Sequence, residues 1–427
     1  MEMTWFHPRD ELVATMQRIY RYKMTTTSGG NLSILDPSGD IWITPSRVDK
    51  GGLQPTDIAC VHPDGTRTGL HAPSSELPFH QEIYRRRPDI KAIVHAHPGA
   101  LVAFSICRLL PDTRVQSHAF SICGRVALAP YACPGTAELG EKIAATFAGG
   151  ADCVLLENHG VVIGGADLQE AFQRFETLEF VAQTLIKAHQ LGAVHVLPPE
   201  FLSVGTMPEF GDLPAAVPTI REKELRTELC RFLHRAYQQR LLISTAGAFS
   251  ARLDEKQFLV TPRRRDRLEV QPPGIIRATR TACEAGKRPS RAALLHALIY
   301  ERHPDIGAVI NAQPAHASAF CVSGAPLSTH TIPESYVVLN NAPMLPFLRI
   351  VEDADRIAAQ ISLRNCPVIL IENEGVLVVG KNILDAFDRL EVLEATSEAL
   401  LLSRPLGPVV SMPPAAIDEL RRVFNVT

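Results

Sequence analysis

Apolar and polar residues repeat along this chain with two different periods. Apolar residues recur at helical spacing over 10–22 and over 225–237, and the stretch 167–189, rich in Glu, Ala, Leu and Phe, also predicts a helix. Short apolar runs between turn residues predict strands at 31–35, 40–44, 92–97 and 152–157. Because helices alternate with strands, the pattern predicts a layered α/β fold.

Blocks of the first half of the chain recur in the second half at a nearly constant spacing. His80 matches His296, an offset of 216 residues, within blocks of similar sequence. The matched blocks are 43–47 with 260–264, 73–84 with 289–300, 87–98 with 303–314, and 155–164 with 370–380. The order and spacing indicate a duplication on the scale of a whole domain, because solenoid repeats are much shorter.

The duplication predicts where the domains begin and end. We expect a first domain over 1–200 and a second over 219–427, each of ordinary domain size. The segment between them, 201–218, is punctuated by Pro and Gly and is interpreted as a linker.

Composition and charge narrow the classes of partner. The chain has 427 residues, 46% of them hydrophobic, and a formal net charge of −3, which gives no electrostatic reason to expect nucleic acid or an anionic membrane. No apolar run approaches a membrane span, and the first ten residues do not resemble a secretion signal. The nine cysteines are scattered without Cys-x-x-Cys spacing, which favours reduced thiols and a cytoplasmic protein.

Three histidines of the first copy form a candidate metal site. His95 and His97 lie two apart at the end of a predicted strand, so both side chains point to one face. His159 lies in a turn after another apolar strand. Three imidazoles with an open fourth position are typical of a catalytic zinc site, although imidazole also suits other divalent ions.

The second copy supports treating these histidines as a set. It keeps the surrounding sequence but carries Asn311, Gln313 and Glu374 where the first copy has the three histidines. Both copies keep the histidine at positions 80 and 296, which we therefore interpret as structural.

Glu76 is the candidate acid/base residue. Its counterpart in the second copy is Ala292, so this carboxylate is absent together with the metal ligands. A carboxylate near a metal can take a proton alpha to a polarised carbonyl. The alternative is a surface or helix-capping glutamate, since a helical pattern begins at Ser75 and Glu76.

These residues carry a resemblance to a known family. The motifs 28–33 (Ser-Gly-Gly-Asn-Leu-Ser), 44–46 (Thr-Pro-Ser), 74–76 (Ser-Ser-Glu), 95–97 (His-Ala-His) and 158–160 (Asn-His-Gly) resemble those of the class II aldolase/adducin family, and the likeness extends over nearly all of both copies. It implies two tandem three-layer α/β/α domains with largely antiparallel central sheets. It also implies that His95, His97 and His159 bind zinc and that Glu76 moves a proton.

The resemblance also predicts a site for an anionic small molecule. Asn31, Ser46, Ser74 and Ser75 match positions that hold the substrate phosphate in sugar-phosphate members, although Gly29-Gly30 taken alone also suits a tight turn. Arg47 stands where the aldolases usually have glycine. An arginine there would crowd a phosphate or grip a carboxylate, which keeps decarboxylation in play.

The function implied is a zinc-dependent lyase that cleaves a small sugar-phosphate or hydroxy-carbonyl substrate through a metal-stabilised enediolate. The alternatives are a decarboxylase, epimerase or dehydratase of the same family, or an adducin-like binding and assembly protein without catalysis. The resemblance further implies a homo-oligomer. In the second copy, Arg263, Arg264 and Arg291 fall in the former anion corner, where they could bind an anion or be solvated.

Overall fold

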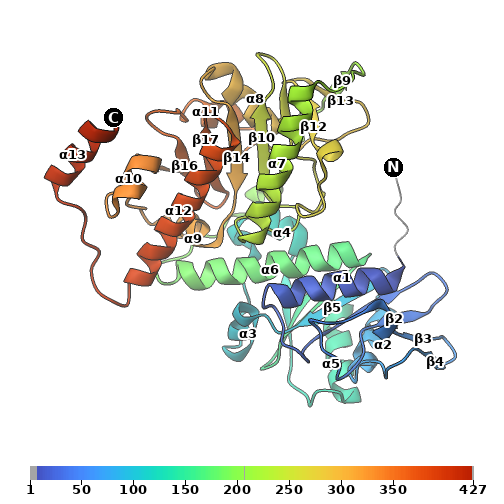
Figure 1. The fold of residues 1–427 in the computed structure, drawn as a ribbon. Coiled ribbons are helices and arrows are strands. Elements are labelled where there is room, and N and C mark those ends of the chain that lie inside the picture. The colour runs from blue at the N-terminus through green and yellow to red at the C-terminus, as the bar shows by residue number, and fades with distance from the viewer. Residues whose placement is uncertain (1–6, 206, 426–427) are drawn as a thin grey trace. The chain divides into compact units, whose positions relative to one another are not determined.

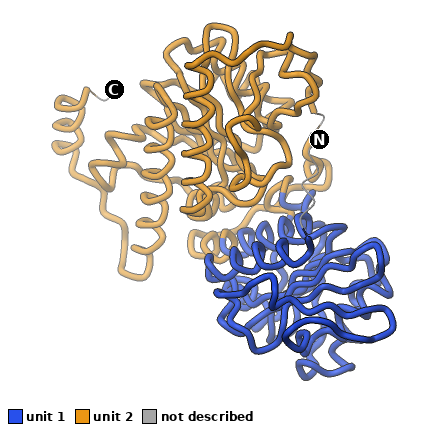
Figure 2. Tube along the Cα trace, turned by 45° about the vertical axis from the view of Figure 1, so that its right-hand side comes forward, with its two compact units in different colours: residues 1–113, 119–183 blue, residues 114–118, 184–427 orange. Residues whose placement is uncertain are grey.

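The computed structural model describes residues 7–205 and 207–425, which form two compact units (Figures 1 and 2). Unit 1 consists of Met1–Thr113 and Ala119–Gln183, and unit 2 of Arg114–His118 and Thr184–Thr427. Two pieces that precede the second copy in sequence therefore belong to unit 2: the short segment Arg114–His118 and the chain that follows Gln183.

Unit 1 is built on a mixed sheet of eight strands in the order β4-β3-β2-β1-β5-β8-β7-β6. Among the described strands of unit 1, only β6 and β7 pair in parallel, so the sheet is largely antiparallel, as expected. The strands are β1 (Asn31–Leu35), β2 (Ile41–Ile43), β3 (Ala59–Val61), β4 (Arg67–Thr68), β5 (Ala92–Ala96), β6 (Val126–Ala129), β7 (Cys153–Leu156) and β8 (Val161–Gly165).

Helices pack on the sheet of unit 1. α2 and α5 lie against each other and share a hydrophobic core with one face of the sheet, while α1 contacts β1 and β2. α1 buries Leu12, Met16 and Ile19 at helical spacing. The helices that begin before residue 184 are α1 (Pro8–Arg21), α2 (Leu77–Arg86), α3 (Gly99–Ile106), α4 (Ser117–Cys123), α5 (Ala137–Ala148) and α6 (Leu168–Ala188).

Unit 2 repeats this sheet and adds one strand. Its order is β15-β16-β17-β14-β10-β11-β12-β13-β9, the same path as in unit 1 with β9 at one edge. β9 (Gly211–Leu213) lies inside the segment expected to be a linker and pairs in parallel with β13. The other strands are β10 (Ala248–Arg252), β11 (Phe258–Val260), β12 (Ile276–Ala278), β13 (Ala282–Glu284), β14 (Ala308–Ala312), β15 (Met344–Leu345), β16 (Val368–Ile371) and β17 (Gly375–Gly380).

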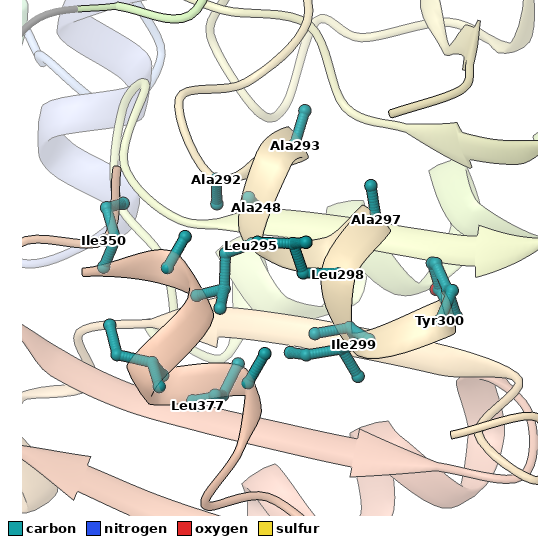
Figure 3. Close-up of a cluster of buried hydrophobic side chains, with 14 of the residues drawn as sticks. Ala248, Ala292, Ala293, Leu295, Ala297, Leu298, Ile299, Tyr300, Ile350 and Leu377 are labelled. Atoms are coloured by element: carbon teal, nitrogen blue, oxygen red, sulfur yellow. The ribbon is translucent and has the colours of Figure 1, made fainter. Parts of the chain in front are cut away.

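The helices of unit 2 follow the same order as those of unit 1. α8 packs on α11 over one face of the sheet, around the apolar cluster of Figure 3, and α12 contacts β14 and β17. They are α7 (Ile220–Gln238), α8 (Ala293–Arg302), α9 (Ala315–Ser323), α10 (Pro333–Leu339), α11 (Ala354–Ala358), α12 (Ile383–Ser403) and α13 (Pro414–Phe424). None of the helices in the described ranges is long and apolar enough to cross a membrane.

Candidate metal centre

The central strands of unit 1 bring the candidate site together. Asn31, the first residue of β1, lies opposite His95 of β5, and His95 lies opposite Val162 of β8. His159 belongs to the turn that joins β7 to β8 and therefore reaches the same end of the sheet. Glu76 stands immediately before α2.

The three predicted imidazoles converge. The ring centroid of His95 lies 4.8 Å from that of His97 and 5.1 Å from that of His159, and the last two are 5.0 Å apart. Their candidate ligand nitrogens all lie within 4.8 Å of one another.

One ring nitrogen of each histidine suits a metal. His95 Nδ1 lies 2.9 Å from the carbonyl oxygen of Val161, and since a carbonyl only accepts, Nδ1 carries the proton and Nε2 carries the lone pair. Nε2 of His95, Nε2 of His97 and Nδ1 of His159 are buried and have no hydrogen-bond partner within residues 7–205 and 207–425. Buried polar atoms without partners are rare in proteins. Because one ring nitrogen of each histidine lies within 4.8 Å of the others, the cluster fits a divalent cation.

Glu76 faces the histidines. Its Oε2 lies 3.3 Å from His95 Nε2, and its Oε1 lies 3.8 Å from His159 Nε2. Although Glu76 occupies the N-cap position of α2, its side chain makes no capping hydrogen bond. Burial raises the pKa of Glu76, but His95, His159 and Asn31 outweigh it and hold the pKa well below its usual range. Glu76 is therefore a carboxylate directed at the candidate site.

The pKa values of the three histidines are shifted in different directions. Burial lowers the pKa of His97 to about 3 and of His159 to about 4, and the neighbouring imidazoles add to the effect in both. Burial also lowers the pKa of His95, but the Glu76 carboxylate outweighs it and leaves the pKa raised. His97 and His159 are therefore neutral at pH 7, which is the form that binds a metal.

A series of hydrogen-bonded side chains, most of them buried, leads to Glu76 and holds it in position. The Tyr84 hydroxyl contacts Ser33 Oγ at 2.6 Å, and Ser33 Oγ contacts His80 Nδ1 at 2.6 Å. His80 Nε2 lies 2.5 Å from Asn31 Oδ1, and Asn31 Nδ2 donates to Glu76 Oε2 at 2.7 Å. Burial lowers the pKa of His80 to about 3, so His80 is neutral, in line with the structural role predicted from the sequence. This series orients the carboxylate.

The family model described as Class II Aldolase and Adducin N-terminal domain matches residues 10–186 and 227–401, most of the chain. This chain belongs to the class II aldolase and adducin family. Each match covers one copy, as the duplication predicted.

Individual relatives of this chain within the family are named for different reactions. It is 33% identical over 181 residues to 3-oxo-tetronate 4-phosphate decarboxylase of Escherichia coli, covering 42% of this chain and 85% of the relative. It is 35% identical over 196 residues to 5-deoxy-D-ribulose 1-phosphate aldolase of Bacillus thuringiensis, covering 44% and 89%. A solved L-fuculose 1-phosphate aldolase shares 33% identity, with 46% of this chain and 92% of the other covered and a TM-score of 0.42.

The candidate anion-binding residues of the first family domain lie on two joined loops. An isolated bridge pairs Pro45 with Pro73, and Ser74 N donates to the carbonyl oxygen of Thr44 at 3.2 Å. The bridge brings Ser46 toward Ser74 and Ser75, next to Glu76. Ser74 is buried and Ser75 is exposed. Asn31 is also buried, and its side chain donates to Glu76 Oε2, which places it beside the candidate acid/base residue.

Arg47 has a backbone feature that the sequence did not reveal. Its φ is +59°, and the matching Arg264 of the second domain has φ +51°. A left-handed φ favours glycine, so the backbone alone would favour that residue at position 47, whatever the size of a ligand pocket. Arg47 is exposed, and no contact joins it to Glu76 or the three histidines in the part of the chain that the structure describes.

The second family domain has a different set of side chains at the corresponding place. Ala248 and Ala292 replace Asn31 and Glu76, and both lie in the apolar cluster of Figure 3. The supporting series persists there: Tyr300, Ser250 and His296 keep their contacts, but His296 Nε2 now meets Oδ1 of Asn311 at 2.7 Å. Asn311 stands where His95 stands in the first domain, so the amide has moved to the neighbouring strand.

A buried ion pair occupies the rest of the second domain's centre. Glu374, the counterpart of His159, is 4% exposed and accepts a hydrogen bond from Arg291 Nη2 at 2.9 Å. Burial raises the pKa of Glu374, and Arg291 opposes that effect. Arg291 is the counterpart of Ser75.

A second group of metal-compatible side chains in unit 1 is accounted for by hydrogen bonds. Asp40, Cys60 and His62 lie close together. His62 Nδ1 lies 2.9 Å from Asp40 Oδ1, and its Nε2 lies 3.3 Å from Thr68 Oγ1, so both ring nitrogens have partners. Burial, with Asp40 nearby, raises the pKa of Cys60, which disfavours the thiolate that binds metals.

Proposed function

We propose that the first domain is a divalent-metal-dependent lyase that cleaves a small phosphorylated hydroxy-carbonyl compound by a retro-aldol reaction. The observation that carries this proposal is the convergence of His95, His97 and His159, with unpaired ring nitrogens, beside the ionised Glu76. When bound, a divalent cation would polarise the substrate carbonyl as a Lewis acid, and zinc is the ion that best fits three imidazoles.

The chain's own residues would position the substrate and move the proton. Asn31, Ser46, Ser74 and Ser75 offer an amide and hydroxyls on β1 and on the two joined loops next to Glu76, which suits the phosphate group of a substrate. Glu76, as a carboxylate, would accept the proton from the substrate hydroxyl and return it to the carbon fragment that is left after cleavage. The hydrogen bond from Asn31 would keep the carboxylate in position.

Decarboxylation is the second candidate reaction. It is supported by the relative named as a 3-oxo-tetronate 4-phosphate decarboxylase, which is about as similar to this chain as the aldolases are. Both kinds of relative are named for phosphate esters, which supports a phosphorylated substrate. A panel of phosphorylated ketoses and phosphorylated 3-oxo acids, assayed for aldehyde and for carbon dioxide, would separate the two reactions.

The metal content of the protein tests the first step of this proposal. Protein purified without added metal should contain about one divalent ion per chain, and the His95→Ala variant should contain none. About two ions per chain would mean that Asn311, Gln313 and Glu374 also bind a metal. An absence of bound metal, even after incubation with zinc, would leave a non-catalytic binding or assembly function.

We further propose that the chain forms a homo-oligomer. The reason is a short segment, here called a strap, that occurs once in each copy: the strap of the first copy packs on unit 2, and among the described residues the strap of the second copy has no equivalent contact. The strap 194–201 (Val-His-Val-Leu-Pro-Pro-Glu-Phe) resembles the strap 409–416 (Val-Val-Ser-Met-Pro-Pro-Ala-Ala). Each strap bonds to the matching loop: Leu197 N donates to the carbonyl of Arg114 at 2.9 Å, and Met412 N donates to that of His330 at 2.8 Å.

Among residues 7–205 and 207–425, the first strap has a receiving surface and the second strap does not. Within unit 2, His195 N donates to the Val322 carbonyl, and Asn373 Nδ2 donates to the carbonyls of Val115 and His195 at 2.9 Å. Val322 is fully buried. Its counterpart in unit 1, Ile106, is 56% exposed, and Val410 of the second strap is 82% exposed.

The second strap of one chain therefore suits the Ile106 surface of another chain. Such a head-to-tail contact closes into a ring when the rotation allows it. Asn158, the counterpart of Asn373, belongs to the same surface as Ile106. Because Asn158 directly precedes His159, a partner chain bound there would border the metal centre.

Val410→Asp should reduce the oligomer to a monomer at micromolar concentration, measured by analytical ultracentrifugation, because the charge would be buried against Ile106. Val217→Asp, at an 87% exposed valine outside the strap, is the matched control and should leave the mass unchanged. A monomeric wild-type protein, or an oligomer unaffected by Val410→Asp, would refute this contact.

A further inference from the structure

At the positions in unit 2 that correspond to the anion corner of unit 1, two joined loops place four arginines. A bridge pairs Pro262 with Pro289, and Arg263 N donates to the carbonyl of Arg288 at 2.9 Å, just as Pro45 pairs with Pro73 in unit 1. The loops thus hold Arg263 and Arg264 next to Arg288 and Arg291. At the same positions unit 1 has Ser46, Arg47, Ala72 and Ser75.

Positive charge in this corner exceeds negative charge. Arg291 is bound to Glu374, but no carboxylate pairs with Arg263, Arg264 or Arg288 among residues 7–205 and 207–425. The backbone bond between Arg263 and Arg288 holds these like charges on adjacent loops, and the pKa of Arg263 is lowered by burial and further by the charges of Arg264, Arg291 and Arg288. Repulsion between like charges destabilises the folded state unless an anion relieves it.

We propose that this arginine corner of unit 2 (Arg263, Arg264, Arg288 and Arg291) binds a phosphate group, either inorganic phosphate or the phosphoryl group of an ester. Guanidinium groups match the tetrahedral oxygens of phosphate by paired hydrogen bonds. Because Ala248 and Ala292 have replaced Asn31 and Glu76, and Glu374 is engaged by Arg291, the bound phosphate compound would not be transformed. The corner is therefore a ligand-binding site separate from the chemistry of unit 1.

This proposal does not depend on the function proposed for unit 1, and the test separates the two. Full-length protein is titrated with inorganic phosphate, and separately with glycerol 3-phosphate, by calorimetry at low salt. In a His95→Ala/Ser75→Ala background, which removes one of the three proposed metal ligands and one proposed phosphate contact of unit 1, saturable binding should persist. Arg263→Gln/Arg288→Gln should weaken it at least about tenfold. Arg280→Gln, at an exposed arginine of unit 2 paired with Glu301, controls for net charge and should change affinity little.

Thermal unfolding supplies a second readout that a purely structural role for these arginines would not give. Without phosphate, Arg263→Gln/Arg288→Gln should raise the unfolding temperature of the protein because it removes repulsion. With phosphate, the wild type should gain stability and the double variant should not. Arg291 is left intact because its removal would strand the buried Glu374 carboxylate.

Three results would overturn the proposal: no saturable binding up to about 10 mM phosphate, equal affinity in the double variant, or a lower unfolding temperature of that variant without phosphate. Binding of glycerol 3-phosphate alone would keep the site and assign it to an ester. Equal binding of both ligands would assign recognition to the phosphoryl group.

Discussion

Glu76→Gln should lower kcat/KM by about 10²- to 10⁴-fold while the protein keeps its metal. Glutamine preserves the size of the side chain and can still accept the hydrogen bond that Asn31 donates, so the main loss is the ability to exchange a proton. Steady-state kinetics on the substrate found in the panel, together with metal analysis of the same preparation, measures both quantities.

Glu82→Gln is the matched control for this variant. Glu82 lies on α2, where it pairs with Arg85 in solvent, and its replacement should leave kcat/KM nearly unchanged. If Glu76→Gln keeps wild-type activity, Glu76 is not the acid/base group, and its role is limited to the start of α2.

Gly160→Ala should weaken metal binding by roughly 10- to 100-fold, because the added methyl group has no room beside the site. An ideal Cβ at Gly160 would lie 2.5 Å from Cδ2 of His97 and 2.7 Å from the carbonyl oxygen of Ala96, and the second of these atoms is fixed in β5. The imidazole of His97 must therefore move. Equilibrium dialysis against zinc measures the change.

Gly99→Ala tests whether the effect of Gly160→Ala is local. Gly99 also lies near His97 in the chain, but a Cβ there would have no neighbour within 4 Å, so the variant should bind zinc as the wild type does. Equal zinc affinity in the Gly160 and Gly99 variants would contradict the geometry described for His97.

The sequence predicted the parts of the structure that depend on local pattern. The period-two spacing of His95 and His97 and the turn before Gly160 were sufficient to expect the three imidazoles at one end of a sheet, because strand geometry fixes the direction of each side chain. Comparison of the two copies then distinguished His80, which both copies keep, from the histidines that only one copy keeps.

Features that depend on contacts between distant segments could not be predicted in this way. The hydrogen-bonded chain from Tyr84 to Glu76 joins residues of β1 and α2, and only the fold brings them together. The pairing of Arg291 with Glu374 likewise links two loops 83 residues apart. The left-handed backbone at Arg47 was hidden because arginine rarely adopts it, whereas a glycine there would have suggested it.

The move of one amide between neighbouring strands constrains how the second domain could have diverged. The buried His296 needs a hydrogen-bond acceptor for its Nε2, and Asn311 now supplies it. In unit 1 the acceptor for the matching His80 is Asn31, whose counterpart in unit 2 is position 248. A chain that lost Asn at 248 before gaining Asn at 311 would pass through a state with an unsatisfied buried imidazole, at a cost of about 1–3 kcal/mol. In a second domain that started from the arrangement of unit 1, the two substitutions would be epistatic, and Asn311 would have to replace the His95 equivalent first. Restoring a metal site in unit 2 would have to retrace that order, with Ala248→Asn preceding Asn311→His.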